Sequence, residues 1–248
     1  MSTTAHHAPN GATTAGDHEG VWEDRTRVFL QPVAAPSILG LFGFAGATFM
    51  VAAHLAGWYG TATTNEYLFP FAAAFGGIAQ FTAAIWSYRA RDGLATAMHG
   101  MWGSFWMAFG LLFLLVATGT LTVPAAGAFP PLAYWFFVLA VITGCGMLAS
   151  LAESLGLFAT LLTLAVGSAL LGIHYLVGGL GWQHTGGWVL IASAICATYT
   201  ATAMMLEGSY GRVVLPLGKL TRAANIPGSR VTVPVQNRYG MPGVRAGQ

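Results

Sequence analysis

Charged residues are scarce in this chain, and their scarcity excludes a water-soluble globular domain. Only 7% of the 248 residues are Asp, Glu, Lys or Arg, whereas 55% are hydrophobic. Soluble domains carry roughly 25% charged residues. A chain of this composition cannot cover its apolar surface with polar side chains in water. The composition therefore indicates an integral membrane protein whose surroundings are the lipid bilayer.

Other residue types are also too few for several functions. The chain has two cysteines, Cys145 and Cys196, and neither belongs to a CxxC or Cys/His pattern, so we predict small buried apolar residues and no disulfide or metal site. The net charge is only +2, and no basic patch alternates with aromatic residues, which argues against a nucleic-acid partner. No nucleophile–base pair can be assembled either. We expect no catalytic residue, no metal ion and no cofactor.

What the chain has instead is six apolar stretches, each about 20 residues long, which is the length needed to cross a bilayer as a helix. Backbone polar groups cannot stay unpaired in lipid, so each stretch is predicted to be α-helical. The fold class predicted is an all-α integral membrane protein with a six-helix transmembrane bundle. The predicted spans are Pro36–Ala56, Leu68–Tyr88, Ala95–Ala117, Leu132–Ala152, Gly156–Gly178 and Gly187–Leu206.

The basic residues predict the orientation of this bundle. All ten lie in the N-terminal tail, in the loop after the second span or in the C-terminal tail. Short loops rich in Lys and Arg stay in the cytoplasm, so both termini are predicted to be cytoplasmic and the protein to lie in the inner (plasma) membrane. We divide the chain into a disordered N-terminal tail (1–34), the transmembrane domain (35–207) and a basic, proline-containing C-terminal tail (208–248).

The predicted spans contain no aspartate, lysine or arginine, which argues against a proton pump built on buried carboxylates. Helical rise places Phe44, Trp102 and Leu164 at one depth, about 10–12 Å from the cytoplasmic face. Gln80, on the returning second helix, reaches the same depth. Three bulky apolar side chains and one amide can therefore form a ring. In the same second helix the adjacent glycines Gly76 and Gly77 favour a kink or a local opening.

The intramembrane histidines suggest an alternative function. His54 and His174 lie near the outer ends of their helices and could reach a common depth, as a pair of haem ligands would need. That arrangement would make the protein a membrane redox subunit. His99 lies near the inner face without an obvious partner. For single histidines of this kind we prefer a neutral, hydrogen-bonded packing role.

The sequence resembles the acetate uptake transporter family over about residues 36–218. The segment from Phe75 to Gln80 is similar to the family's aromatic-Gly-Gly-x-x-Gln motif, and Gly103–Trp106 is similar to its Gly-Ser-Phe-Trp motif. The segment Tyr210–Gly218 resembles the conserved closing segment that follows the last span. Order and spacing agree along the chain.

This resemblance implies a hexamer of six-helix protomers, each with its own pore and an apolar constriction. The constriction falls on Phe44, Trp102 and Leu164, with Gln80 and Ser104 as polar contacts for the substrate. The implied function is a transporter or channel for small monocarboxylate anions, acetate and possibly succinate, with proton linkage. An uncharged pathway also fits ammonia or another small solute, so that alternative stays open beside the redox subunit.

Three departures from the family pattern bear on selectivity. Trp102 stands where the family usually has tyrosine, and the larger indole predicts a tighter pore or another preferred substrate. The family's Asn-Pro-Ala-Pro-Leu-Gly-Leu motif becomes the run from Ala35 to Leu41, without the asparagine and the second proline. The acidic residue that often follows the glutamine by seven positions is Ser87 here.

Overall fold

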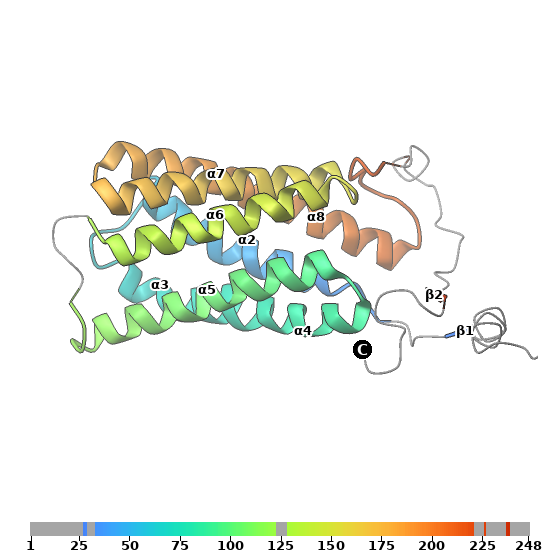
Figure 1. The fold of residues 1–248 in the computed structure, drawn as a ribbon, viewed down its shortest axis with the longest axis horizontal. Helices are drawn as coiled ribbons and strands as arrows, with labels where there is room; N and C mark the ends of the chain where they lie inside the picture. Colours follow the sequence, from blue (N-terminus) through green and yellow to red (C-terminus); the bar gives the residue numbers. More distant parts are fainter. Residues whose placement is uncertain (1–26, 29–32, 123–127, 221–225, 227–236, 239–248) are drawn as a thin grey trace, which may run out of the picture. The chain divides into compact units, whose positions relative to one another are not determined.

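The computed structural model describes residues 27–28, 33–122, 128–220, 226 and 237–238. Within the unit Val33–Val231, six membrane-length helical spans lie side by side (Figure 1). The second span is built from three consecutive elements, α3, η1 and α4. The elements are α2 (Pro36–Leu55), α3 (Asn65–Phe71), η1 (Ala72–Ala79), α4 (Gln80–Ala90), α5 (Gly93–Ala117), α6 (Pro130–Ser150), α7 (Leu155–Val177) and α8 (Leu180–Tyr210).

These helices confirm the six predicted spans, and the main difference is the length of the last one. The predicted span Gly187–Leu206 has become a helix of 31 residues, Leu180–Tyr210. Hydropathy marks only the part of a helix that lies in hydrocarbon, whereas the backbone stays helical through the polar interface. Gln183 and His184 at one end and Glu207 at the other lie in the added turns. The second span is likewise longer, Asn65–Ala90.

The local opening predicted at Gly76 and Gly77 is confirmed as a π-helix, η1. Pro70, just before it in α3, lacks a backbone donor, and a wider helical turn is one way to accommodate such a break. The glycines also let α5 approach closely. A Cβ at Gly77 would lie 2.7 Å from Met107 Cγ, and one at Gly76 would meet the Trp106 ring.

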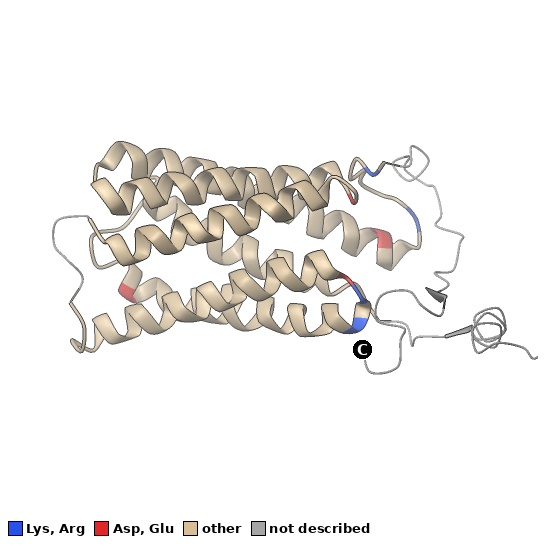
Figure 2. Cartoon of the chain, viewed as in Figure 1, with Lys and Arg blue, Asp and Glu red and all other residues tan. Residues whose placement is uncertain are grey.

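The spans pack in a closed order around a central space. α2 contacts α8, α8 contacts α7 and α7 contacts α6; α6 then contacts α5, which packs on η1 and α4. The second span also contacts α2, through η1 and α4, and this contact closes the ring of helices. The Lys and Arg residues that the structure describes in this unit gather at one end of the bundle (Figure 2).

The segment after α8 folds back onto the bundle, although it belongs to the tail that we had separated from the transmembrane domain at residue 208. Val213 and Leu217 are buried. The backbone N–H groups of Leu155 and Gly156 donate to the carbonyls of Gly218 and Leu217 at 3.1 and 3.0 Å. Two N–H groups that the start of α7 leaves without helical partners are thereby satisfied. The tail beyond residue 220 lies almost wholly outside the described residues.

Two further expectations need correction. Cys145 is exposed on the protomer and Cys196 is half-buried, both as free thiols, because their helices present these positions outward and not to the core. The second unit, Met1–Pro32 with Thr232–Gln248, contains a pairing that we did not predict. Strands β1 (Arg27–Val28) and β2 (Asn237–Arg238) are antiparallel. The remainder of the predicted N-terminal tail lies mostly outside the described residues.

Candidate functional site

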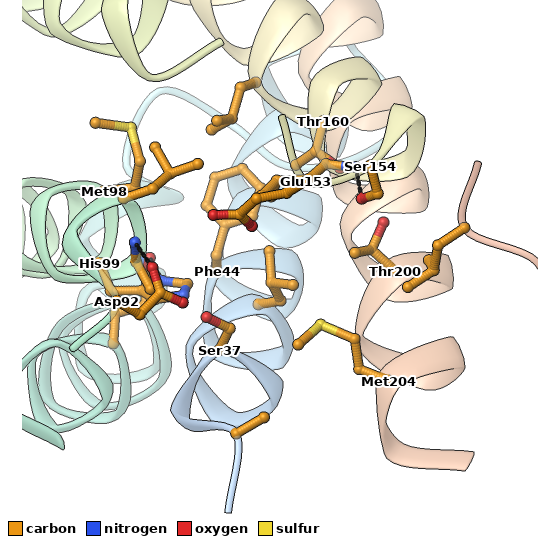
Figure 3. Close-up of a pocket in the computed structure, with 18 of the residues that line it drawn as sticks. Ser37, Phe44, Asp92, Met98, His99, Glu153, Ser154, Thr160, Thr200 and Met204 are labelled. Atoms are coloured by element: carbon orange, nitrogen blue, oxygen red, sulfur yellow. Dashed lines mark hydrogen bonds between the residues drawn. The ribbon is translucent and has the colours of Figure 1, made fainter. Parts of the chain in front are cut away.

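A cavity of about 460 Å³ lies inside the bundle, between α2, α4, α5, α7 and α8. We call it the large cavity. Its walls are mainly apolar, with a small number of polar and charged side chains, as in most small-molecule sites. In Figure 3, Asp92 and His99 lie on one wall, Glu153 and Ser154 lie on the facing wall, and Ser37 and Phe44 lie between them.

Three helix N-termini surround the mouth of the large cavity. Its lining includes Ala35 and Ser37 from the start of α2, Asp92 before α5, and Ser154 before α7. Asp92 Oδ1 accepts a hydrogen bond from Ala95 N at 2.8 Å, and Ser154 Oγ accepts one from Leu157 N at 3.2 Å. Each helix adds partial positive charge at its N-terminus. The backbone of these three helices therefore makes the electrostatic potential at the mouth more positive, and none of the three contributes a lysine or arginine side chain to the lining.

Carboxylates also stand at this mouth. Asp92, Glu153 and Glu207 all line the large cavity, and Glu207 forms an ion pair with Lys219 at 2.9 Å. The Glu153 side chain points into the space between the two walls (Figure 3). Partial burial of its carboxyl group raises the pKa of Glu153, and the negative charge of Asp92 raises it further. Glu153 therefore takes up a proton at a higher pH than an ordinary glutamate.

This shift predicts the pH dependence of Glu153→Gln. The raised pKa means that the folded chain binds this proton more readily than the unfolded chain, so ionised Glu153 lowers stability as pH rises through that pKa. We expect the variant to unfold at a higher temperature than the natural chain at pH 7–8. The difference should vanish below about pH 4, where the unfolded carboxyl group is also protonated. Thermal unfolding in detergent between pH 4 and 8 measures this.

Glu66→Gln provides the comparison for Glu153→Gln. Glu66 is in the first turn of α3, where the helix dipole favours a negative charge. Its loss should lower stability at neutral pH, the opposite sign. If Glu153→Gln and Glu66→Gln changed the unfolding temperature in the same direction and by the same amount at neutral pH, a raised pKa for Glu153 would be contradicted.

The three side chains that helix counting had placed at one depth all lie on the wall of the large cavity. Phe44, Trp102 and Leu164 are 3%, 3% and 2% exposed and all line the cavity. The Phe44 and Trp102 rings meet edge to face with centroids 6.3 Å apart. Each residue follows the start of its helix by eight or nine positions, a rise of about 12–14 Å. We call these three residues the constriction.

Two residues of the constriction lie beside a second cavity. Trp102 and Leu164 also line a second cavity of about 30 Å³, here called the small cavity, which continues toward Leu55 at the far end of α2. Thr48 and Trp106, both buried, line it with side-chain polar atoms that have no hydrogen-bond partner within the described residues. Two spaces thus lie in series along the bundle, with bulky side chains between them.

Trp102 is held in place by a hydrogen bond that it donates to the neighbouring helix α6. Its Nε1–H donates to Thr143 Oγ1 of α6 at 3.0 Å, and both side chains are buried. The indole N–H therefore bonds to the protein and is not available to hydrogen-bond a substrate. An edge-to-face contact with Phe105 at 5.3 Å fixes the ring from its own helix.

Removal of this anchor should loosen the constriction. Thr143→Val keeps the side-chain shape but leaves Trp102 Nε1 as a buried donor without a partner, which costs about 1–3 kcal/mol. We expect lower thermal stability and a faster passive leak through the protein. Thr163→Val is the control, because the Thr163 hydroxyl bonds to the carbonyls of Ala159 and Thr160 on its own helix. Equal leak in both variants would contradict a role for the anchor.

Gln80 also lines the large cavity and is 1% exposed. Its Nε2 donates to the carbonyl of Gly76, in η1, at 2.9 Å. Its Oε1 lies 3.5 Å from His99 Nδ1. The amide is therefore oriented by the π-helical turn and presents its acceptor oxygen to His99.

Ser104 does not reach this site. It is absent from the lining of both cavities, and its hydroxyl donates to the carbonyl of Gly100 one turn earlier at 2.8 Å. A residue two positions after Trp102 faces a different side of α5, so the substrate contact that the family resemblance implied for Ser104 is not found at this cavity. Ser87 is buried in the same way, with its hydroxyl bonded to the carbonyl of Ala83 at 2.8 Å.

The two histidines of the predicted pair each contact a backbone carbonyl close to the end of their own helix. His54 Nδ1 contacts the carbonyl of Tyr59 at 3.1 Å, and His174 Nδ1 contacts that of Gly179 at 3.1 Å. Each ring thus joins the end of its helix to the loop that follows. His99, Asp92 and Glu153 were not among our predicted site residues. The only sequence signal for them was polarity close to the starts of the third and fifth spans.

A membrane bundle with two cavities in series and an uncharged constriction between them has the architecture of a transporter or channel. The chain belongs to the GPR1/FUN34/yaaH family, whose sequence model matches residues 24–222. It is 27% identical over 187 residues to the succinate-acetate/proton symporter SatP of Escherichia coli (strain K12), covering 75% of this chain and 96% of SatP. An uncharacterized protein of Methanothermobacter thermautotrophicus is 29% identical over 196 residues, covering 76% and 93% of the two chains.

The fold comparison agrees with the sequence comparison. The solved structure of the bacterial acetate channel SatP superimposes with a TM-score of 0.69 and 27% identity, covering 75% of this chain and all of that one. The predicted family is therefore confirmed. Membership of a family that contains a symporter and a channel also confirms that the chain is a transport protein and not an enzyme.

Proposed function

We propose that this protein moves small monocarboxylates, with acetate as the leading substrate, across the membrane through the large cavity, the constriction and the small cavity. The observation that carries this proposal is that Trp102 and Leu164 line both cavities. The names of the relatives, an acetate channel and a succinate-acetate/proton symporter, supply the substrate class. Proton linkage belongs to the same proposal.

The electrostatics of the entrance fit a weakly held anion. Three helix N-termini attract negative charge at the mouth, while Asp92 and Glu153 oppose it. The attraction of the helix N-termini lets a carboxylate enter, and the repulsion of the two acidic side chains keeps it from binding tightly. Conduction requires this combination of entry and release. Gln80 then offers a polar contact just before the constriction. We assign the substrate contact to Gln80 and exclude Ser104 from it.

Orientation and assembly complete the proposal. We place the end of the bundle with the described Lys and Arg residues in the cytoplasm, following the charge bias of short loops, so that the large cavity opens to the cell interior. The same proposal places the protein in the inner (plasma) membrane with both termini in the cytoplasm. The constriction is built within one protomer, so a hexamer would contain six parallel pathways. Mass measurement of the detergent complex tests the hexamer.

Solute flux in proteoliposomes tests the function. Purified protein is reconstituted, and initial uptake of labelled acetate, succinate, lactate and methylammonium is compared with protein-free vesicles, which report the permeation of the neutral acid or amine through lipid. We expect protein-dependent uptake of acetate above that of succinate. Uptake of all four solutes at the protein-free rate would contradict transport, and uptake of methylammonium alone would favour ammonia transport.

A further inference from the structure

His99 stands out as a buried titratable side chain on the wall of the transport cavity that the proposed function does not yet use. It is 5% exposed and lines the large cavity together with Gln80 and Phe44. The backbone of α2 makes room for it at Gly40. A Cβ there would lie 2.5–2.6 Å from three atoms of the His99 ring. The packing therefore holds the imidazole edge at the cavity, one turn before Trp102 on the same helix.

The hydrogen bonds of the site determine which ring nitrogen can bind a proton. Gln80 Nε2 donates to Gly76 O at 2.9 Å, so the acceptor Oε1 of the same amide faces His99 Nδ1 at 3.5 Å. A neutral imidazole carries one proton, and the oxygen beside Nδ1 places that proton on Nδ1. Nε2 is then the basic nitrogen. Within the described residues no hydrogen bond to His99 Nε2 is formed.

The charged groups around this imidazole lie toward the mouth. α2 contacts the ring through Gly40, and α4 contacts it through Gln80, both uncharged. Arg89 and Arg91, at the end of α4, are not among the residues that line the cavity. The charged and titratable groups that share the cavity with His99 are Asp92, Glu153, Glu207 and Lys219. Glu207 is paired with Lys219, so Asp92 and Glu153 are the acidic groups that a proton meets on its way from the mouth to His99.

From this geometry we propose that His99 is the residue that couples proton and carboxylate transport, and the proposal rests on the proposed function. Nε2 takes a proton that enters through the mouth, and the imidazolium then hydrogen-bonds the substrate carboxylate. The proton next moves from Nε2 to the carboxylate oxygen: the N–H bond breaks, an O–H bond forms, and His99 returns to its neutral state. The substrate reaches the constriction as the neutral acid.

This step removes the main cost of crossing the constriction. A carboxylate that enters a dry apolar site without compensating donors is strongly disfavoured, and the one indole N–H there is bonded to Thr143. An ion pair and the corresponding neutral pair have the same total charge, but burial favours the neutral pair. One proton therefore accompanies each carboxylate, and transport carries no net charge.

The test is whether flux responds to membrane potential. Labelled acetate uptake is measured in proteoliposomes at pH 7.5 with potassium and valinomycin setting the potential, after subtraction of the protein-free rate. The natural chain should give the same rate at about 0 and about 60 mV. His99→Gln and His99→Phe should lose most of the flux. The remaining flux, carried by the anion alone, should become several-fold sensitive to the potential, since about 59 mV changes the equilibrium of one charge tenfold. His184→Gln, an exposed position on α8, should behave like the natural chain.

The outcomes separate the two proposals. Absence of protein-dependent acetate uptake in the natural chain would overturn the proposed function. Potential-sensitive flux in the natural chain, or potential-insensitive flux in both His99 variants, would overturn the role of His99 alone. If both variants lose all flux, 15N NMR of histidine-labelled natural protein decides, with His99→Gln identifying the signal. Acetate should then change the protonation of His99 Nε2, and an unchanged signal would overturn the proposal.

Discussion

Replacement of Trp102 by alanine should open the pathway between the two cavities. Trp102 and Leu164 line both spaces, so loss of the indole merges them at their narrowest point. We expect uptake of larger monocarboxylates such as butyrate and benzoate to rise about tenfold or more, corresponding to a barrier lowered by about 1.4 kcal/mol. The same truncation should cost about 3–5 kcal/mol of stability. Labelled uptake in proteoliposomes, with thermal unfolding of the same preparation, measures both effects.

Trp102→Phe is the matched control for this opening. Phenylalanine keeps an aromatic ring against Phe44 but cannot donate to Thr143, so it separates the steric effect from the hydrogen bond. The size limit should stay close to that of the natural chain, with only a moderate loss of stability. Unchanged size selectivity in the alanine variant would show that the substrate does not pass this indole.

The second large effect is expected at Gly43, where α2 meets η1. A Cβ at this position would contact the backbone carbonyl oxygen of Phe75 and would lie 3.2 Å from Ala79 Cβ. Because the clashing atom belongs to the backbone, a side-chain rotation cannot relieve it. Gly43→Ala should therefore push α2 away from η1, at a cost of about 1–3 kcal/mol. For a domain of this size that corresponds to a fall of about 2–12 °C in the unfolding midpoint.

Gly144→Ala makes the same chemical change without the clash. No atom lies within 4 Å of a Cβ built there, although Gly144 is also inside a helix. Alanine is favoured over glycine in a helix by about 0.8–1.0 kcal/mol, so this variant should be as stable as the natural chain or more stable. A lower midpoint at 144, or an unchanged one at 43, would contradict the close approach of α2 and η1.

The sequence predicted those parts of the molecule that depend on helix periodicity and hydrophobicity. Six spans follow from six apolar stretches, and the common depth of Phe44, Trp102 and Leu164 follows from helical rise alone. Two adjacent glycines predicted a kink or a local opening in the second span, and the structure has a π-helix there. These predictions needed no knowledge of how the helices pack.

Features that depend on helix rotation could not be predicted in this way. Depth did not reveal that Ser104 faces away from the cavity, nor that Trp102 Nε1 reaches Thr143 on α6. His99 was taken for an isolated packing residue because Gln80 is 19 positions away in sequence. Asp92 and Glu153 lie outside the predicted spans, so a prediction limited to polar residues within the spans did not include the side chains at the mouth of the cavity.

Cysteine accessibility tests the central claim, that substrate crosses the large cavity to the constriction. Leu161 lines that cavity one turn before Leu164 and is 4% exposed, whereas Leu162 is 39% exposed. Leu161→Cys and Leu162→Cys are compared in a chain whose Cys145 and Cys196 are replaced by serine. A membrane-impermeant methanethiosulfonate added at the cavity mouth should block acetate uptake only in Leu161→Cys, and acetate should slow the modification. Full uptake after complete modification of Leu161→Cys would contradict the pathway.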